Sequence, residues 1–212
     1  MTYDKDKIVT SAIVILHLVG AVGSALPQTR DLTISLTPIN LLITAGLLIY
    51  CHDAPKKRLF IFLTTSFLIG YFIEVIGVAS GFPFGEYSYG RTLGFKVLDV
   101  PLLIGVNWFI LSYGFGMLTA GLRANKFVKA LVGALGMVGL DFFIEPIAIR
   151  FDYWAWAEHS IPLSNYLGWF VIAFLIQRLF HMLFNKNMNK QSGITIASQV
   201  FYFNFLLIFF KF

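Results

Sequence analysis

Three carboxylic acids stand inside apolar stretches of this sequence. Glu74 lies within residues 59–80, and Asp141 and Glu145 lie within residues 127–149. Insertion scales put the cost of a carboxylate inside a membrane span at about 2.5–3.5 kcal/mol, so such residues are expected to have a function. Their spacing of four places Asp141 and Glu145 on one helix face. Low-dielectric surroundings and a like-charged neighbour favour the neutral acid, and a neutral acid can donate a proton.

The same acids also allow a purely structural interpretation. They could pair with Arg91, Arg150 or backbone donors and so hold helices together. That explanation suits one isolated carboxylate. Three at a similar depth are better explained by a functional site, and we predict Glu74, Asp141 and Glu145 to be catalytic.

Two aromatic loops are expected on the side of the bundle where the acids lie. Residues 81–90 alternate aromatic residues with Gly and Pro. We interpret them as a lid or re-entrant segment, which is tolerated at membrane depth only where it lines a cavity. Residues 151–165 contain Trp154 and Trp156, which would also suit an aromatic belt at the membrane surface.

Two further apolar runs each begin with an Asn and a Trp. Asn107 and Trp108 open one run, and Asn165 and Trp169 open the other. An Asn inside a span often bonds a neighbouring helix. The alternative is that the two amides position a water molecule while the aromatic faces stabilise a cation.

The composition indicates that all these residues belong to a membrane protein. Of the 212 residues, 58% are hydrophobic and 13% are charged, whereas soluble domains carry about 25% charged residues. A spanning helix needs about 20 apolar residues. Seven runs qualify: 8–26, 32–51, 59–80, 100–121, 127–149, 164–184 and 193–210. We predict an all-α polytopic membrane helix bundle of about seven transmembrane helices, forming a single integral membrane domain over residues 1–212.

Basic residues divide unevenly between the two ends of this bundle. One end carries Lys5, Lys7, Lys56, Lys57, Arg58, Arg123, Lys126, Lys129, Arg178, Lys186 and Lys190, and the other carries Arg30, Arg91, Lys96, Arg150 and Lys211. Lys and Arg accumulate in cytoplasmic loops. We therefore expect a cytoplasmic N-terminus, an outer layer of acids, and a bacterial cytoplasmic membrane as the location. The net charge of +5 reflects these short loops, so the expected partner is the lipid bilayer and not nucleic acid.

Two features limit other interpretations. The run at 8–26 follows Lys5 and Lys7 as a signal peptide would, but it is longer than the 7–15 residues of a signal core, so we expect a retained helix. The single cysteine, Cys51, allows no internal disulfide and no thiolate metal site. The sequence also lacks CxxC, HExxH, phosphate-loop and GxSxG motifs. We predict no metal and no cofactor.

The most specific string in the chain is Glu74-x-x-Gly77-Val78-x-Ser80-Gly81-x-Pro83-Phe84-Gly85-x-Tyr87-x-Tyr89. It is followed by Leu93-Gly94, Val100-Pro101-Leu102, Trp108, Asp141-x-x-x-Glu145-Pro146-Ile147-Ala148, Tyr153-Trp154-x-Trp156 and Ile161-Pro162-x-x-Asn165-Tyr166-x-Gly168-Trp169-Phe170. Together these strings resemble the membrane carotenoid-biosynthesis family, which includes the acyclic carotenoid hydratases and the bisanhydrobacterioruberin hydratases. The sequence departs from the family at Glu145, where Asp is common, and at Phe95, where Pro is common.

The resemblance implies an enzyme that adds water to the terminal isoprenoid double bond of an acyclic carotenoid and forms a tertiary alcohol, without a redox cofactor or metal. Our hypothesis is that Glu74 or Asp141 protonates the alkene and that a second carboxylate, such as Glu145, takes a proton from the attacking water; the sequence does not assign acid and base among the three. The rings of Tyr87, Tyr89, Trp108 and Trp169 would stabilise the cation. The residues expected to bind the substrate are Phe84, Tyr87, Tyr89, Asn107, Trp108, Trp154, Trp156, Asn165 and Trp169. Water, the carotenoid and other carotenoid-pathway enzymes are the expected partners.

Three other classes of membrane protein would share parts of this pattern. A retinal photoreceptor needs an intramembrane Lys, and every Lys here lies in a loop or at a span end. A carotenoid cyclase or isomerase would use similar cation chemistry and stays open. A non-enzymatic polyene-binding protein or a transporter also stays open, but a transporter would need a polar route through the cytoplasmic half, which the sequence predicts to be apolar.

Overall fold

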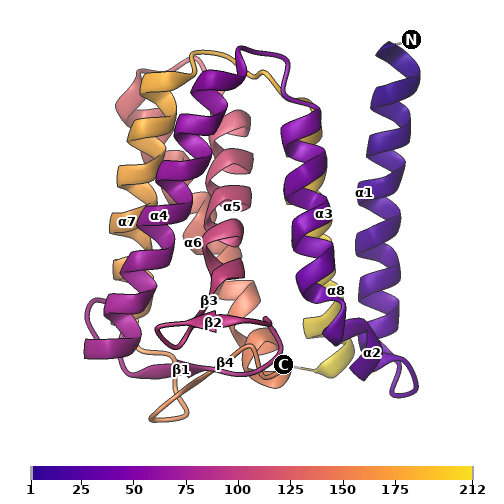
Figure 1. Cartoon of the computed structure of the whole chain (residues 1–212), viewed down its shortest axis with the longest axis vertical. Helices are drawn as coiled ribbons and strands as arrows, with labels where there is room; N and C mark the ends of the chain where they lie inside the picture. Colours follow the sequence, from indigo (N-terminus) through magenta and orange to yellow (C-terminus); the bar gives the residue numbers. More distant parts are fainter. Residues whose placement is uncertain (1, 212) are drawn as a thin grey trace.

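The computed structural model describes residues 2–211, with side chains from Lys5 onward, so the two end residues of the expected domain lie outside it. Eight helices run between the two ends of the described chain: α1 (Thr2–Ala25), α2 (Arg30–Ser35), α3 (Thr37–Tyr50), α4 (Lys56–Ser80), α5 (Leu102–Ala120), α6 (Lys126–Arg150), α7 (Leu163–Leu183) and α8 (Gln191–Phe210). Four short strands join them: β1 (Tyr87–Tyr89), β2 (Lys96–Val97), β3 (Val100–Pro101) and β4 (Trp154–Trp156). The predicted all-α polytopic bundle is confirmed (Figure 1).

Six of the seven expected spans are single helices that are long and apolar enough to cross a bilayer. The prediction for residues 32–51 is wrong, because the chain turns at Leu36 between α2 and α3. Pro38 stands in the first turn of α3, where its missing N–H costs least, and its ring would clash with the carbonyl of Ile34 in one continuous helix, which favours a break here. The 14 residues of α3 reach only about 21 Å at 1.5 Å per residue, which is less than the roughly 30 Å of a bilayer's hydrocarbon core.

The helix connections separate into two ends as the charge pattern predicts. Figure 1 shows the N-terminus with the α3–α4, α5–α6 and α7–α8 connections at one end, and the strands, α2 and the C-terminus at the other. We call these the inner and outer ends. That the inner end faces the cytoplasm stays a prediction from the distribution of Lys and Arg.

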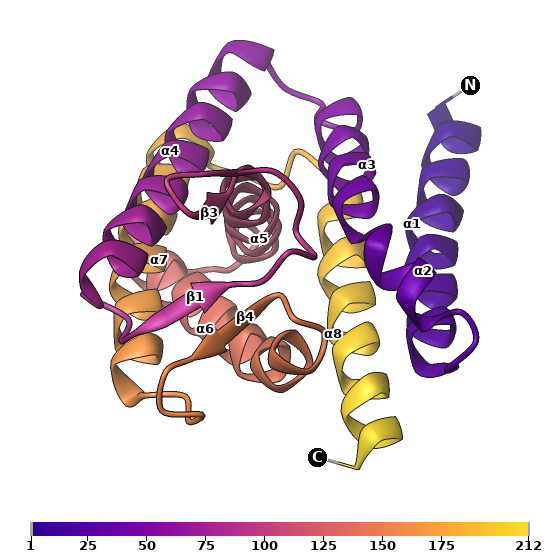
Figure 2. The same cartoon turned by 60° about the horizontal axis from the view of Figure 1, so that its bottom comes forward.

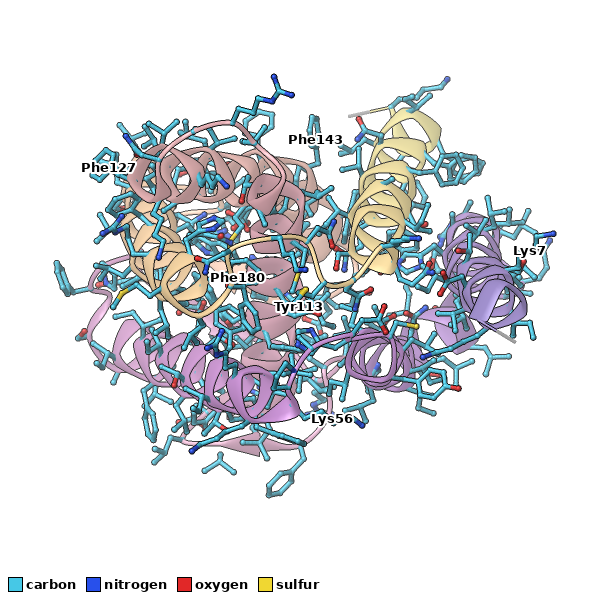
Figure 3. The ribbon with its side chains drawn as sticks, turned by 90° about the horizontal axis from the view of Figure 1, so that it is seen from above. Lys7, Lys56, Tyr113, Phe127, Phe143 and Phe180 are labelled. Carbon is cyan, nitrogen blue, oxygen red and sulfur yellow. The ribbon has the colours of Figure 1, made fainter. Side chains whose placement is uncertain are left out.

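The bundle is built around α5, most of whose residues are buried. Helices α4, α6, α7 and α8 contact it, and α1 packs mainly on α8 at the edge. Seen from the inner end, Tyr113 and Phe180 point into the interior, whereas Lys7 lies at the periphery (Figure 3). Because α5 is surrounded by protein, polar groups on it can face other helices instead of lipid.

The two aromatic loops meet at the outer end in a small sheet that the sequence analysis did not predict. β1 and β4 pair antiparallel, with Tyr87 opposite Trp156 and Tyr89 opposite Trp154. β2 and β3 form a separate antiparallel pair. Figure 2 shows β1 and β4 lying across the ends of α4, α5, α6 and α7. The segment interpreted as a lid is therefore half of a sheet that covers the outer end of the bundle.

Candidate active site

Glu74 lies near the outer end of α4 and accepts hydrogen bonds from three neutral side chains. The hydroxyls of Tyr87 and Tyr89 donate to its Oε2 over 2.6 and 2.8 Å. The indole N–H of Trp108 donates to Oε1 over 3.1 Å. The side chain is only 3% exposed, so its position is fixed by contacts from β1 and α5.

Two glycines of α4 allow these donors to approach. A methyl group on Gly77 would lie 2.5 Å from the Tyr87 hydroxyl and 2.9 Å from the Phe84 ring. A methyl group on Gly70 would collide with the indole of Trp108. Since Gly77 follows Glu74 by about one helical turn, the bare backbone there lets Tyr87 lie over the helix and reach the carboxylate.

Asp141 and Glu145 form a second group one turn apart on α6. The amide of Asn165, at the start of α7, donates to Asp141 Oδ2 and to Glu145 Oε1, both over 3.1 Å. The indoles of Trp154 and Trp156 donate to Glu145 Oε2 over 3.0 and 2.9 Å. Asp141 is fully buried, and its Oδ1 has no hydrogen-bond partner within the described part of the chain.

The pairing of β1 with β4 explains why both groups of donors point the same way. Side chains two apart on a strand lie on one face of the sheet. Tyr87 and Tyr89 therefore share a face, and so do their partners Trp156 and Trp154. From one face of this small sheet, two phenols donate hydrogen bonds to Glu74 of α4 and two indoles donate to Glu145 of α6.

These side chains surround one small cavity. Its volume is about 20 Å³, room for about one water molecule. It is lined by Glu74, Phe84, Tyr87, Tyr89, Ile104, Asn107, Trp108, Glu145, Trp154, Trp156, Asn165 and Trp169. The structure thus brings together all nine predicted substrate-binding residues and two of the three predicted acids. It leaves Asp141 out of the lining, behind Asn165.

Aromatic rings form much of the cavity wall. The indoles of Trp108 and Trp169 stack with their centroids 4.2 Å apart. The rings of Tyr87 and Trp156 lie 5.1 Å apart at 45°. Ring faces attract a cation electrostatically, most strongly those of Trp. The cavity therefore combines two carboxylates with surfaces suited to a carbocation.

The phenols next to Glu74 are held as hydrogen-bond donors. Burial, followed by the charge of Glu74, raises the pKa of both Tyr87 and Tyr89 above the ordinary phenol value, which is about 10. Both hydroxyls therefore keep their protons at neutral pH. A neutral phenol donates a hydrogen bond to the carboxylate without bringing a charge of its own.

Some sequence-based interpretations need correction at this site. The donors to the three acids are phenols, indoles and an amide instead of Arg91 or Arg150. Trp154 and Trp156 contact Glu145 and do not serve only as a membrane-surface belt. Ile104 was missed as a lining residue. Its spacing of four from Trp108, which places both on one face of α5, was the available signal.

Comparison with known proteins now decides the family. Residues 36–211 match the carotenoid biosynthesis protein family, and this match covers every residue of the cavity. The chain belongs to the carotenoid biosynthesis protein family. It is also 33% identical over 127 residues to the bisanhydrobacterioruberin hydratase of Haloarcula japonica, covering 56% of this chain and 43% of that protein. The matched part thus spans less than half of that relative's length. No solved structure matches.

This member of the carotenoid biosynthesis family also has buried polar groups at its inner end, contrary to expectation. His52 Nδ1 and the Tyr113 hydroxyl lie 2.6 Å apart, and Asn189 donates to the same hydroxyl over 3.3 Å. Gln177 donates to the carbonyl of Ser112 over 2.8 Å. The expectation of an apolar cytoplasmic half, which was used against a transporter, is therefore wrong.

Proposed function

We propose that this protein is a carotenoid hydratase, a hydro-lyase that adds water to the terminal isoprenoid double bond of an acyclic carotenoid. The observation that carries the proposal is the cavity itself. Two carboxylic acids, Glu74 from α4 and Glu145 from α6, face a space of about 20 Å³ walled by indole and phenol rings. Hydration of an alkene requires a proton donor, a proton acceptor, a held water and a surface that tolerates a cation.

The reaction balances with these residues alone. The carboxyl proton of Glu74 is transferred to the less substituted carbon of the double bond, which leaves a tertiary cation on the neighbouring carbon. The oxygen of the held water forms a bond to that cation, and Glu145 removes a proton from this oxygen. The product is a tertiary alcohol. A proton then returns from Glu145 to Glu74 before the next cycle.

Asp141 is assigned a positioning role because it does not line the cavity. It accepts one hydrogen bond from Asn165, whose amide also binds Glu145. In this arrangement Asp141 fixes the orientation of Asn165, and Asn165 fixes that of Glu145. The alternative, in which Asp141 itself protonates the alkene, requires it to reach the substrate.

The partners follow from the same site. The substrate is an acyclic carotenoid, the second reactant is water, and other enzymes of the carotenoid pathway are proposed as neighbours in the bilayer. The positive inner loops favour a bacterial cytoplasmic membrane. Fractionation of expressing cells would test this location.

Single substitutions of the acids test the assignment in a bacterial host that accumulates lycopene. Glu74→Gln and Glu145→Gln should each lower hydration by about 10²–10⁴-fold, the usual contribution of a general acid or base. Asp141→Asn should stay within about tenfold in kcat with little change in KM, because its carbonyl can still accept from Asn165. Asp141→Leu, which cannot accept, is the matched control and should lose more.

Mass spectrometry of the extracted pigments gives the readout. Products heavier by one or two waters support the proposal. Their loss in Glu74→Gln and Glu145→Gln supports the roles of these two acids as proton donor and proton acceptor. If the Asp141→Asn protein is inactive, Asp141 transfers a proton in the reaction and the positioning role is wrong. An isomer of unchanged mass would indicate a cyclase. Wild-type protein in the membrane that hydrates neither lycopene nor a C50 precursor would rule the proposal out.

A further inference from the structure

A larger and mostly apolar pocket adjoins the acid cavity. It lies between α1, α3, α5, α6 and α8 and has a volume of about 280 Å³. Ile104, Asn107 and Trp154 line both this pocket and the acid cavity. The two spaces therefore meet at these three side chains, and a ligand in the larger one would have its end next to the acids.

The pocket is bordered by residues that are exposed on the outside of the bundle. Val19 of α1 is 65% exposed, and Ile39 and Ile43 of α3 are 53% and 42% exposed. These three apolar side chains also line the pocket. Because α1 is long and apolar enough to cross a bilayer and α3 is a shorter apolar helix beside it, we expect these exposed apolar side chains to face lipid. The pocket thus borders the bilayer on the side where α1 and α3 lie next to each other (Figure 1).

We propose that this pocket binds the isoprenoid chain next to the reacting end of the carotenoid, which enters sideways from the bilayer between α1 and α3. The terminal double bond then lies at Asn107 and Trp154, at the mouth of the acid cavity, which itself has room for about one water molecule. The inference rests on the proposed function and adds the binding site of the substrate chain. An apolar polyene dissolved in the membrane reaches such an opening without crossing water.

The size of the pocket limits how much of the substrate it holds. Pockets that enclose a drug-sized ligand measure about 300–1,000 Å³, and this one is just below that range at about 280 Å³. A C40 or C50 chain therefore does not fit whole. One end occupies the pocket while the rest of the chain remains among the lipid tails.

Helix α1 gives this pocket a wall that the family match does not include. The match begins at residue 36, whereas Leu16, His17, Val19 and Gly20 of α1 line the pocket. α1 is held against α8 by hydrogen bonds from Thr10 to Gln191 and between Ser24 and Tyr202. The wall on α1 therefore lies outside the region that matches the family.

Pigment retention by the purified full-length protein tests the proposal, with lycopene as the probe. Gly20→Leu places a larger side chain in the pocket. A Cβ at position 20 would already lie 3.4 Å from the Tyr202 ring. Ile43→Trp narrows the opening at an exposed position and does not disturb the interior. Gly46→Leu is the matched control on α3, because a Cβ at Gly46 meets nothing within 4 Å. Glu74→Gln removes the proposed proton donor, so its pigment retention reports binding of lycopene without hydration.

The expected result is about tenfold less lycopene per protein for Gly20→Leu, the scale of an overpacked site, and a smaller reduction for Ile43→Trp. Gly46→Leu and Glu74→Gln should retain as much pigment as wild type, counted as lycopene and hydrated product together. Normal retention by both filled variants, or no retention by wild type, would overturn the proposal. Because Glu74→Gln reports binding without turnover, failure of the hydratase proposal alone would leave this pattern of retention intact.

Discussion

Neutral donors surround both carboxylates in the cavity, and this choice of residue type has a chemical consequence. Glu74 accepts from two phenols and an indole, and Glu145 accepts from two indoles and an amide. An Arg or Lys in these places would repel a carbocation formed a few ångströms away. Phenols and indoles hold the carboxylates without a positive charge and also present ring faces to the cation.

The stacked indole of Trp169 provides a test of that role at the residue scale. Its hydrogen-bonding nitrogen is not used for the acids, so its expected contribution is its ring face. Trp169→Leu should lower kcat by about 30-fold, equivalent to a desolvated cation–π interaction of about 2 kcal/mol. Trp169→Phe, which retains a ring, should lose less. Equal losses in the two variants would show that packing, and not the ring face, explains the effect.

The elements around the site show what a sequence pattern can and cannot predict. The acids, the Asn residues and the aromatic pairs were identified because a polar residue in an apolar run is unusual by itself. The pairing of β1 with β4 was not predicted, because strands of three residues carry almost no pattern and are far apart in the chain. The alternation of Tyr87 with Tyr89, and of Trp154 with Trp156, was the only local sign of a strand.

The break in the expected second span has a similar explanation. Hydropathy averaged over residues 32–51 detects a spanning run and is insensitive to one residue. Pro38 decides the local geometry, because a proline can begin a helix but cannot stand in the middle of one without distortion. The sequence therefore predicted an apolar segment at this place and did not predict that it is divided into two helices.

Close approach between β1 and α4 gives a prediction at the scale of elements. Gly77→Ala places a methyl group 2.5 Å from the Tyr87 hydroxyl, so Tyr87 must move away from Glu74. The loss of one hydrogen bond to Glu74, which begins the reaction as the neutral acid, costs about 0.5–1.5 kcal/mol and should lower activity by roughly 2- to 10-fold. Gly139→Ala on α6, where a Cβ meets nothing within 4 Å, should be unaffected. Equal activity of the two variants would contradict the role assigned to Tyr87.

The whole molecule places the acid cavity at the outer end of the bundle, beside a mostly apolar pocket. Such an arrangement receives a long substrate by one end and keeps its middle in the membrane. A carotenoid with two reactive ends must therefore leave and enter again in the reverse orientation. The activity is expected to proceed one end at a time.

That expectation is tested by the time course of hydration. Lycopene should first give a product heavier by one water, which accumulates before the product heavier by two waters appears. Pigments sampled at short intervals and analysed by mass spectrometry would show the order. Appearance of the doubly hydrated product from the start, without the intermediate, would contradict binding of one end at a time.

The central claim is that the buried acids add a water molecule to a carotenoid double bond. Its most direct test is incubation of membranes containing this protein with lycopene in oxygen-18-labelled water, followed by mass spectrometry of the pigments. The account predicts one labelled oxygen for each hydrated end with wild-type protein, and none with Glu74→Gln or Glu145→Gln. A new pigment without labelled oxygen, or labelled product from both variants at the wild-type rate, would contradict it.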